Sequence, residues 1–177
     1  SLTYDFTIEI LEDSDGDGMP NELPDDYDPT NPVSPGLIED LDDDNDGNSD
    51  VDEETDGTDP TNPDTDGDGM CDGSVASPPH CVAGPDAFPL DPAGDTDTDG
   101  DGNPDTLNPP SNSDPALVED LDDDGDGLPD SIDPFPMDGA ATLDSDGDGM
   151  PDFLNGSSTT GLIADPDDDD DGIFQMS

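Results

Sequence analysis

The chain has 177 residues, of which 53 are Asp or Glu, none is Lys or Arg and one is His, so its formal charge is −53. This balance excludes nucleic-acid binding, which needs cationic side chains to displace phosphate counterions, and it disfavours anionic membrane surfaces. No apolar stretch approaches the ~20 residues of a membrane span, so we expect no membrane insertion. Leu, Ile, Val and Phe make up about 16% of the residues, below the roughly 20% at which a strongly charged chain is expected to be disordered.

The first twelve residues differ from the rest of the chain. Leu2, Tyr4, Phe6, Ile8 and Ile10 alternate with mostly polar residues, which predicts a β-strand over residues 1–12. A lone strand is not stable, so it needs a partner. We expect either the last strand of an upstream sandwich domain or a strand that pairs with another copy of the chain, which would join subunits head to tail in a fibre.

From residue 13 onward the sequence repeats a D-x-D-x-D-G motif seven times. We number each loop from its first Asp, and the loops in chain order from 1 to 7. The aspartates at positions 1, 3 and 5 are Asp13, Asp15 and Asp17; Asp42, Asp44 and Asp46; Asp64, Asp66 and Asp68; Asp97, Asp99 and Asp101; Asp122, Asp124 and Asp126; Asp144, Asp146 and Asp148; and Asp167, Asp169 and Asp171.

The spacing matches a 12-residue calcium loop. Such a loop binds Ca²⁺ through side chains at positions 1, 3, 5, 9 and 12 and the carbonyl of position 7, with Gly at position 6 for a sharp turn. Position 7 holds Met19, Asn48, Met70, Asn103, Leu128, Met150 and Ile173; position 9 holds Asn21, Asp50, Asp72, Asp105, Asp130 and Asp152; and position 12 offers Glu53, Asn108, Asp133 and Asn155. Because no Lys or Arg can neutralise these carboxylates, we expect about one to two Ca²⁺ ions per loop.

The helices that flank the loops of true EF-hands are not expected here. Prolines interrupt the segments after most loops, and no run keeps apolar residues at helical spacing for two turns. A single helical turn remains compatible with the sequence around Asp50 to Thr55. We therefore predict an irregular, elongated loop-and-turn rod over residues 13–177, organised by calcium, with 22 residues between the paired loops that start at Asp42 and Asp64 and at Asp122 and Asp144.

Cys71 and Cys81 bracket the one stretch where the order of the loops is interrupted. They predict either a disulfide, contributing about 2–3 kcal/mol by restricting the unfolded chain, or two free thiols in a reducing cytosol. Weak calcium loops also need the calcium levels found outside cells, so both features favour a secreted or surface protein. Asn155-Gly156-Ser157 matches the N-glycosylation pattern. His80 is expected on the surface.

Taken together, the alternating loops and intervening strings such as Asp28-Pro29-Thr30-Asn31-Pro32 and Asp86-Ala87-Phe88-Pro89-Leu90 resemble thrombospondin type 3 repeats, in particular those of large secreted or surface proteins of marine bacteria and archaea. The resemblance covers residues 13–177 and implies a chain of calcium-binding repeats that serves as a stalk, spacer or adhesive segment. It also implies that neighbouring aspartates complete loops without an acid at position 12. The nearest in sequence are Asp25, Asp40, Asp95, Asp120 and Asp165.

The function expected from the sequence is therefore an extracellular, calcium-binding structural protein: a stalk, spacer or fibre subunit. The alternatives are a calcium-dependent adhesin segment and a disordered acidic calcium buffer. We expect no enzyme, because the carboxylate pairs are accounted for as calcium ligands, the chain has no Trp, and His80 stands alone as a base.

Overall fold

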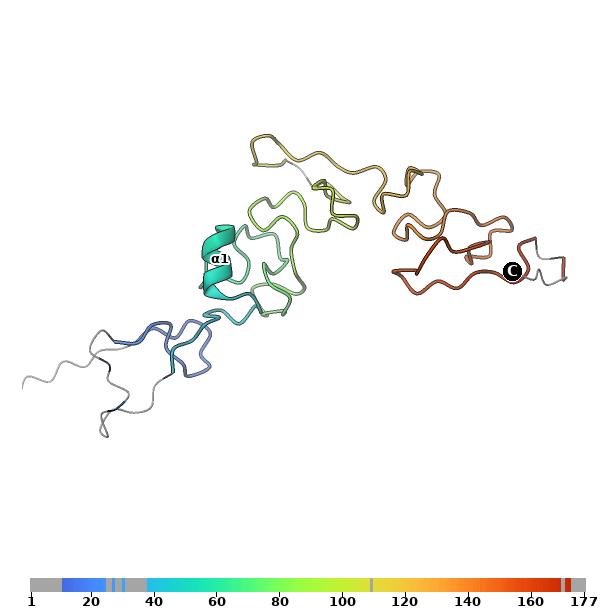
Figure 1. Cartoon of the computed structure of the whole chain (residues 1–177). Coiled ribbons are helices and arrows are strands. Elements are labelled where there is room, and N and C mark those ends of the chain that lie inside the picture. The colour runs from blue at the N-terminus through green and yellow to red at the C-terminus, as the bar shows by residue number, and fades with distance from the viewer. Residues whose placement is uncertain are drawn as a thin grey trace, which may run out of the picture. The chain divides into compact units, whose positions relative to one another are not determined.

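The computed structural model describes residues 11–24, 27, 30, 38–108, 110–169 and 171–172. The strand predicted over residues 1–12 lies outside the described residues, except for residues 11 and 12. Asp25 and Ile173 also lie outside them. Contacts between Cα atoms divide the chain into two units, Ser1–Leu90 and Asp91–Ser177. Within each unit the backbone is a succession of loops and turns, so the expectation of an irregular fold with little regular secondary structure is confirmed (Figure 1).

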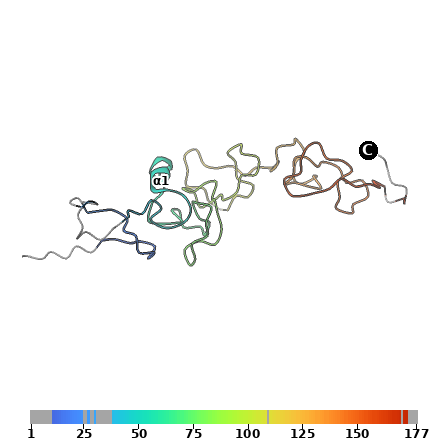
Figure 2. The ribbon, with the colours of Figure 1, turned by 60° about the horizontal axis from the view of Figure 1, so that its bottom comes forward.

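The single helix among the described residues, α1 (Asp50–Asp56), follows loop 2 where the sequence predicted a helical turn. Ser49 caps its start, accepting a hydrogen bond from the amide of Asp52, and three acids in the first turn are favourable at the positive end of the helix dipole. Gly57 ends the helix in a left-handed conformation with φ of 89°. The inner face of α1 carries Glu53, which is fully buried. The turned view shows this helix beside irregular chain (Figure 2).

Glycine at position 6 makes the sharp turn that the motif predicts. Its φ lies between 83° and 104° in all seven loops. A side chain at these angles is strained, so the motif requires glycine there. Position 4 is also left-handed in loops 1 to 6, with glycine in five of them and Asn45, at φ of 59°, in loop 2. Two left-handed residues two positions apart curl each loop around its aspartates.

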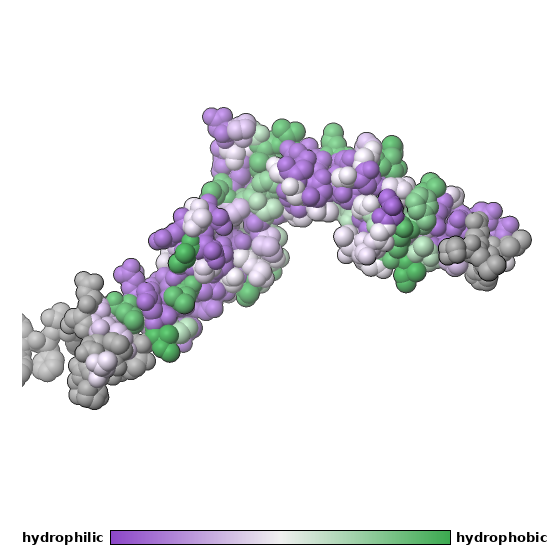
Figure 3. All heavy atoms as spheres, viewed as in Figure 1, coloured by the Kyte–Doolittle hydropathy of each residue, from purple (hydrophilic) through white to green (hydrophobic). Residues whose placement is uncertain are grey.

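Carboxylates outnumber apolar side chains in the interior. The buried apolar residues of the described chain are Cys71, Cys81, Ala93, Phe135, Ala140, Ala141 and the prolines Pro20, Pro63, Pro104 and Pro151, whereas the buried acids are Asp40, Asp43, Asp44, Asp46, Glu53, Asp64, Asp72, Asp86, Asp91, Asp123, Asp133 and Asp138. Many larger apolar side chains are exposed, and Figure 3 shows them scattered in small groups among polar ones. Hydrophobic burial is therefore a minor source of stability here.

Cys71 and Cys81 form a disulfide, as the sequence predicted, and both are fully buried. Next to the bridge, Met70 and Ala83 form an isolated parallel β-bridge. The amide of Cys71 donates to the carbonyl of Ala83, and the amide of Val82 donates to the carbonyl of Gly69 at 3.1 Å. The segment after loop 3 is thus bonded back onto the loop from which it leaves.

Two buried aspartates in the second unit hold distant segments through hydroxyl groups. Asp91 accepts hydrogen bonds from the hydroxyl of Ser111 and the amide of Ser113. At the corresponding place in the next repeat, Asp138 accepts from the hydroxyls of Ser158 and Thr160. Burial alone would raise the pKa of both carboxyls, but these hydrogen bonds hold each pKa well below its ordinary value. Sequence reasoning did not identify either aspartate.

We predict that Asp138→Ala lowers the free energy of unfolding of its repeat by about 2–3 kcal/mol, because it removes a buried charged acceptor from several hydrogen-bond donors. Hydrogen exchange of peptides covering residues 138–162 measures the effect. Asp114→Ala, at an exposed aspartate of the same unit, is the control. Equal exchange in the two variants would show that the buried carboxylate contributes nothing to this connection.

Candidate metal centres

The aspartates at positions 1, 3 and 5 converge. In each group, one carboxylate oxygen per residue lies within 4.8 Å of the corresponding oxygens of the other two. Two further acidic groups meet the same criterion. The groups with this arrangement are Asp13, Asp15 and Asp17; Asp42, Asp44 and Asp46; Asp64, Asp66 and Asp68; Asp97, Asp99 and Asp101; and Asp122, Asp124 and Asp126. The alternation read from the sequence therefore produces clusters of oxygen atoms.

In loops 2 to 6, the aspartates at positions 1, 3 and 5 accept hydrogen bonds from backbone amides of their own loop, and at position 1 of loops 3, 4 and 6 both oxygens do so. In loop 5, Oδ1 of Asp124 accepts from the amide of Asp126 at 3.1 Å, and Oδ1 of Asp126 accepts from the amide of Leu128 at 2.7 Å. Oδ2 of Asp122 accepts from the amide of Gly127 at 3.1 Å. The same three hydrogen bonds recur in loops 2, 3, 4 and 6. Amides thus fix the orientation of each carboxylate.

The second oxygen of several of these aspartates is buried and has no hydrogen-bond partner in the described structure. In loops 2, 3, 5 and 7 these atoms are Oδ1 of Asp42, Oδ2 of Asp44, Oδ2 of Asp66, Oδ2 of Asp124, Oδ2 of Asp126 and Oδ1 of Asp167. Leaving a buried carboxylate oxygen unpaired is costly, and the sequence has no Lys or Arg to pair with it. Convergent, anionic hard oxygens are the ligands that Ca²⁺ prefers, so the residues fit this ion.

Position 12 distinguishes two kinds of loop. Glu53 in loop 2 and Asp133 in loop 5 are buried, and each has a buried oxygen without a partner. Asn108 in loop 4 and Asn155 in loop 6 are exposed. Their backbone amides donate to the backbone carbonyls of Ala93 and Ala140, respectively. The structure therefore brings the acids at position 12 into the protein interior and leaves the two asparagines at the surface, where Asn155 also remains accessible as a glycosylation acceptor.

Position 9 closes the loop. Its side chain accepts a hydrogen bond from the amide of position 2 in loops 1 to 6, at 2.7–3.2 Å. In loop 4, the second oxygen of Asp105 also accepts, from the hydroxyl of Thr98, and in loop 6 Asp152 accepts from the hydroxyl of Ser145 in the same way. Sequence reasoning assigned these side chains to the metal; the structure gives them hydrogen bonds that hold the two ends of the loop together.

Two acidic residues at position 2 join the candidate sites, although the sequence analysis did not select them. Asp43 in loop 2 and Asp123 in loop 5 are buried, and Oδ1 of each has no partner. Burial, with the charges of Asp50 and Asp130 respectively, raises the pKa of each carboxyl to about 6. The signal was present, because only the loops that follow an apolar pair, such as Leu37-Ile38, carry Asp at position 2.

The acids proposed from neighbouring segments have mixed outcomes. Asp40 is buried, and its Oδ1 accepts from the amides of Leu41 and Asp42. Asp120 makes the equivalent bonds before loop 5. Beside burial, the charge of Asp40 raises the pKa of Asp43 in loop 2 and of Asp15 in loop 1, and the charge of Asp120 raises the pKa of Asp123 in loop 5 and of Asp99 in loop 4, so each acid lies near the loop before it as well as the loop after it. Asp165 acts in the same way on Asp146 in loop 6, the loop before it. Asp95 instead accepts from the hydroxyl of its neighbour Thr96.

Mutual repulsion and burial are strongest at loop 2. Burial, then the charges of Asp46 and Glu53, raises the pKa of Asp44 to about 8, and burial with the charge of Asp46 raises the pKa of Glu53 to about 7. In loop 3, burial and the charge of Asp68 raise the pKa of Asp66 to about 6. These groups are held where deprotonation is unfavourable unless a cation is present.

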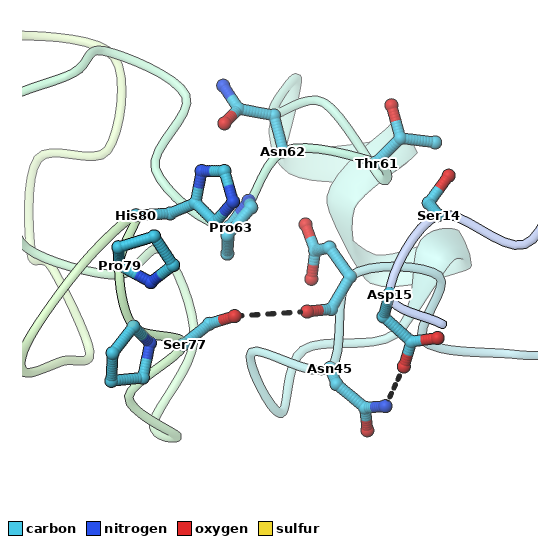
Figure 4. Close-up of a pocket in the computed structure, with 11 residues that line it drawn as sticks. Ser14, Asp15, Asn45, Thr61, Asn62, Pro63, Ser77, Pro79 and His80 are labelled. Atoms are coloured by element: carbon cyan, nitrogen blue, oxygen red, sulfur yellow. Dashed lines mark hydrogen bonds between the residues drawn. The ribbon is translucent and has the colours of Figure 1, made fainter. Parts of the chain in front are cut away.

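A polar pocket of about 390 Å³ adjoins loops 1 and 2 in the first unit (Figure 4). The hydroxyl of Ser77 donates to the carbonyl of Asp44 at 3.5 Å, and the side-chain amide of Asn45 donates to Asp15. His80 lies on its rim and is exposed, as predicted. With Cys71 and Cys81 in a disulfide, His80 has no thiolate partner for a zinc site.

No protein-family model, no curated protein and no solved structure matches the chain. Among the described residues, no helix has the length and apolar character needed to cross a membrane. The function therefore has to be inferred from the loops themselves.

The raised pKa values predict opposite pH dependences with and without calcium. With chelator, a raised pKa in the folded state means that stability is greatest below the ordinary carboxyl pKa and is lost as the pH rises through about 6 to 8. With calcium, binding needs the deprotonated groups, so affinity rises over the same interval.

Urea unfolding at pH 5 and pH 8, in calcium and in a chelator that is effective at both, measures these trends. The account predicts a stability that falls with pH in chelator and rises with pH in calcium. The same trend in both solutions would show that the carboxylates are not coupled to the ion.

Proposed function

We propose that this chain is an extracellular calcium-binding structural protein, built from thrombospondin type 3-like repeats and serving as a stalk, spacer or fibre subunit. The observation that carries the proposal is the different environment of the two oxygens within one carboxylate. In six of the aspartates at positions 1, 3 and 5, which belong to loops 2, 3, 5 and 7, one oxygen accepts from the backbone and the other is buried without a partner. Acidic composition alone would not require this arrangement.

The ligands would come from positions 1, 3 and 5 in every loop, from the position 7 carbonyl, and from an acid at position 12 where one is present. Bound calcium would supply the positive charge that the chain lacks. Even two ions per loop would leave a net charge of about −25, so repulsion would persist and favour an extended arrangement of repeats. Metal binding would then provide folding free energy that apolar burial does not.

An extracellular location follows from the same chemistry. A disulfide persists in oxidising surroundings, and extracellular calcium modules work at dissociation constants of roughly 10⁻⁴–10⁻³ M, which cytosolic calcium would not fill. Self-association in a head-to-tail fibre through the strand at residues 1–12 is part of the proposal. A catalytic role is not, because the carboxylates are committed to the loops and His80 is exposed and isolated.

The loops differ in the number of acidic ligands that they offer, and this difference gives a test. Loops 2 and 5 have buried acids at position 12, whereas loops 4 and 6 have exposed asparagines there. We predict by calorimetry at least two classes of calcium site, with the tighter class separated from the weaker by about tenfold or more, because affinity follows the number of charged ligands. Hydrogen exchange during the titration should show loops 2 and 5 becoming protected first.

The variant Asp124→Ala tests whether the protection of loop 5 depends on its aspartates. It removes one of the three converging aspartates of loop 5, so residues 117–138 should lose their calcium-dependent protection while loops 1 to 3 keep theirs. A chain that binds no calcium would overturn the proposal. Binding without any gain of protection would favour the disordered buffer, and calcium-dependent binding of the isolated chain to a glycan surface would favour the adhesin.

A further inference from the structure

Loop 3 lacks an acid at position 12, where the sequence has Val75. The segment that begins at Asp86, however, repeats the segment that begins at position 12 of loop 5: Asp86-Ala87-Phe88-Pro89-Leu90-Asp91 matches Asp133-Pro134-Phe135-Pro136-Met137-Asp138. Residues 75–85, which we call the insert, separate loop 3 from this segment. Without the insert, Asp86 would stand at position 12.

The backbone of Asp86 makes the hydrogen bond that is found at position 12 in the two loops with an acid there. In loop 2, the amide of Glu53 donates to the carbonyl of position 8 at 2.9 Å, and in loop 5 the amide of Asp133 donates to the carbonyl of position 8 at 3.1 Å. The amide of Asp86 donates at 2.8 Å to the carbonyl of Cys71, which is position 8 of loop 3. The chain therefore returns to loop 3 in register after eleven additional residues.

The side chain of Asp86 also has the environment of the acid in loop 5. Oδ1 of Asp86 accepts from the amide of Phe88 at 2.7 Å, and Oδ1 of Asp133 accepts from the amide of Phe135 at 2.7 Å. Both side chains are more than nine-tenths buried, being 7% and 9% exposed, and Oδ2 of each has no hydrogen-bond partner. A buried carboxylate with a free oxygen requires a cation or a proton.

Asp86 lies near enough to the aspartates of loop 3 for their charges to act on it. Burial raises the pKa of Asp86 to about 7, and the charges of Asp68 and Asp66, two of the three converging aspartates, contribute further. Asp133 has the same relation to Asp126 and Asp122 in loop 5. Oδ2 of Asp66 is likewise buried without a partner. Asp66 and Asp86 thus each have one buried oxygen without a partner.

We propose that Asp86 is the missing position 12 ligand of loop 3, and that the disulfide between Cys71 and Cys81 holds it in place across the insert. This inference rests on the proposed calcium-binding function and adds to it a ligand and a redox dependence. Loop 3 then has acids at positions 1, 3, 5, 9 and 12, as loops 2 and 5 do.

The disulfide joins Cys71, four residues before the insert, to Cys81 within the insert. Cys71 is itself position 8, and its carbonyl is the acceptor for Asp86. The β-bridge between Met70 and Ala83 lies beside it, and Gly84 packs so closely that an added Cβ would collide with the carbonyl of Gly73. Reducing the bridge would free the insert as a flexible loop whose closure opposes the return of Asp86.

The insert segment also touches loop 2. Asp46, the fully buried position 5 aspartate, accepts from the amide of Gly73 through Oδ2, and its carbonyl accepts from the amide of Val75. An added Cβ at Gly73 would collide with Asp46. Loss of the disulfide is therefore expected to disturb loop 2 as well, but less than loop 3, because Gly73 lies before the insert.

The test compares the whole chain with Asp86→Asn and with Asp114→Asn, which removes one exposed charge elsewhere. Calorimetry with calcium should show one site of Asp86→Asn weakened by about tenfold or more, with Asp114→Asn unchanged. Hydrogen exchange of peptides from residues 64–86 assigns the loss to loop 3. The sign of the effect is diagnostic: Asp86→Asn should reduce protection in calcium and leave it unchanged or increased in chelator, since it removes a repelling charge.

A loss of protection in both solutions would mean that Asp86 is only structural, and binding equal to that of Asp114→Asn would exclude it as a ligand. Either result would overturn this inference while leaving calcium binding by the other loops intact. Absence of calcium binding by the unmodified chain would instead overturn the proposed function, so the two failures are distinguishable.

The redox step has its own comparison. Dithiothreitol should lower the calcium affinity of loop 3 in the unmodified chain by about tenfold or more, because the disulfide no longer closes the insert. A variant that lacks residues 75–85 and carries Cys71→Pro, the residue found at position 8 of loop 5, connects Asp86 directly to loop 3 and should be insensitive to the reductant. Unchanged binding by the reduced, unmodified chain would show that the disulfide does not support the site.

Discussion

The central constraint on this structure is that a buried carboxylate has two oxygens and each needs a partner. Backbone amides within each loop satisfy one oxygen, which fixes the direction of the other. In loops 2, 3, 5 and 7 the second oxygen of one or more converging aspartates is buried without a partner, in a chain that has no basic side chain apart from one His. A cation from solution would resolve this imbalance, and the candidate sites, the pH dependence and the proposed location all depend on it.

Much of the local structure was predictable because it is determined by short-range chemistry. The D-x-D-x-D-G spacing fixes which residues converge, the glycine at position 6 fixes the turn, and Ser49 with its following acids explains the short helix α1. The disulfide was also predictable, because Cys71 and Cys81 are the two cysteines of the chain and flank the interruption in the repeat. These features need no knowledge of distant contacts.

What the sequence analysis missed depends on segments that are separated along the chain. Asp91 and Asp138 are held by hydroxyls about twenty residues later, a pairing that spacing within one loop cannot indicate. Asp86 was overlooked because the insert displaces it from position 12, although its resemblance to the segment around Asp133 was visible. The structure also adds hydrogen bonds from the position 2 amide to the position 9 side chains, which depend on how each loop closes, while the assignment of these side chains to the metal stays a prediction.

The most direct test of the central claim is an anomalous-difference map from crystals grown in calcium. The account predicts ion density about 2.3–2.6 Å from the second oxygens of Asp44, Asp66 and Asp124, the atoms for which the backbone provides no donor. Ordered loops with these oxygens bonded to water, and no anomalous density between them, would contradict it.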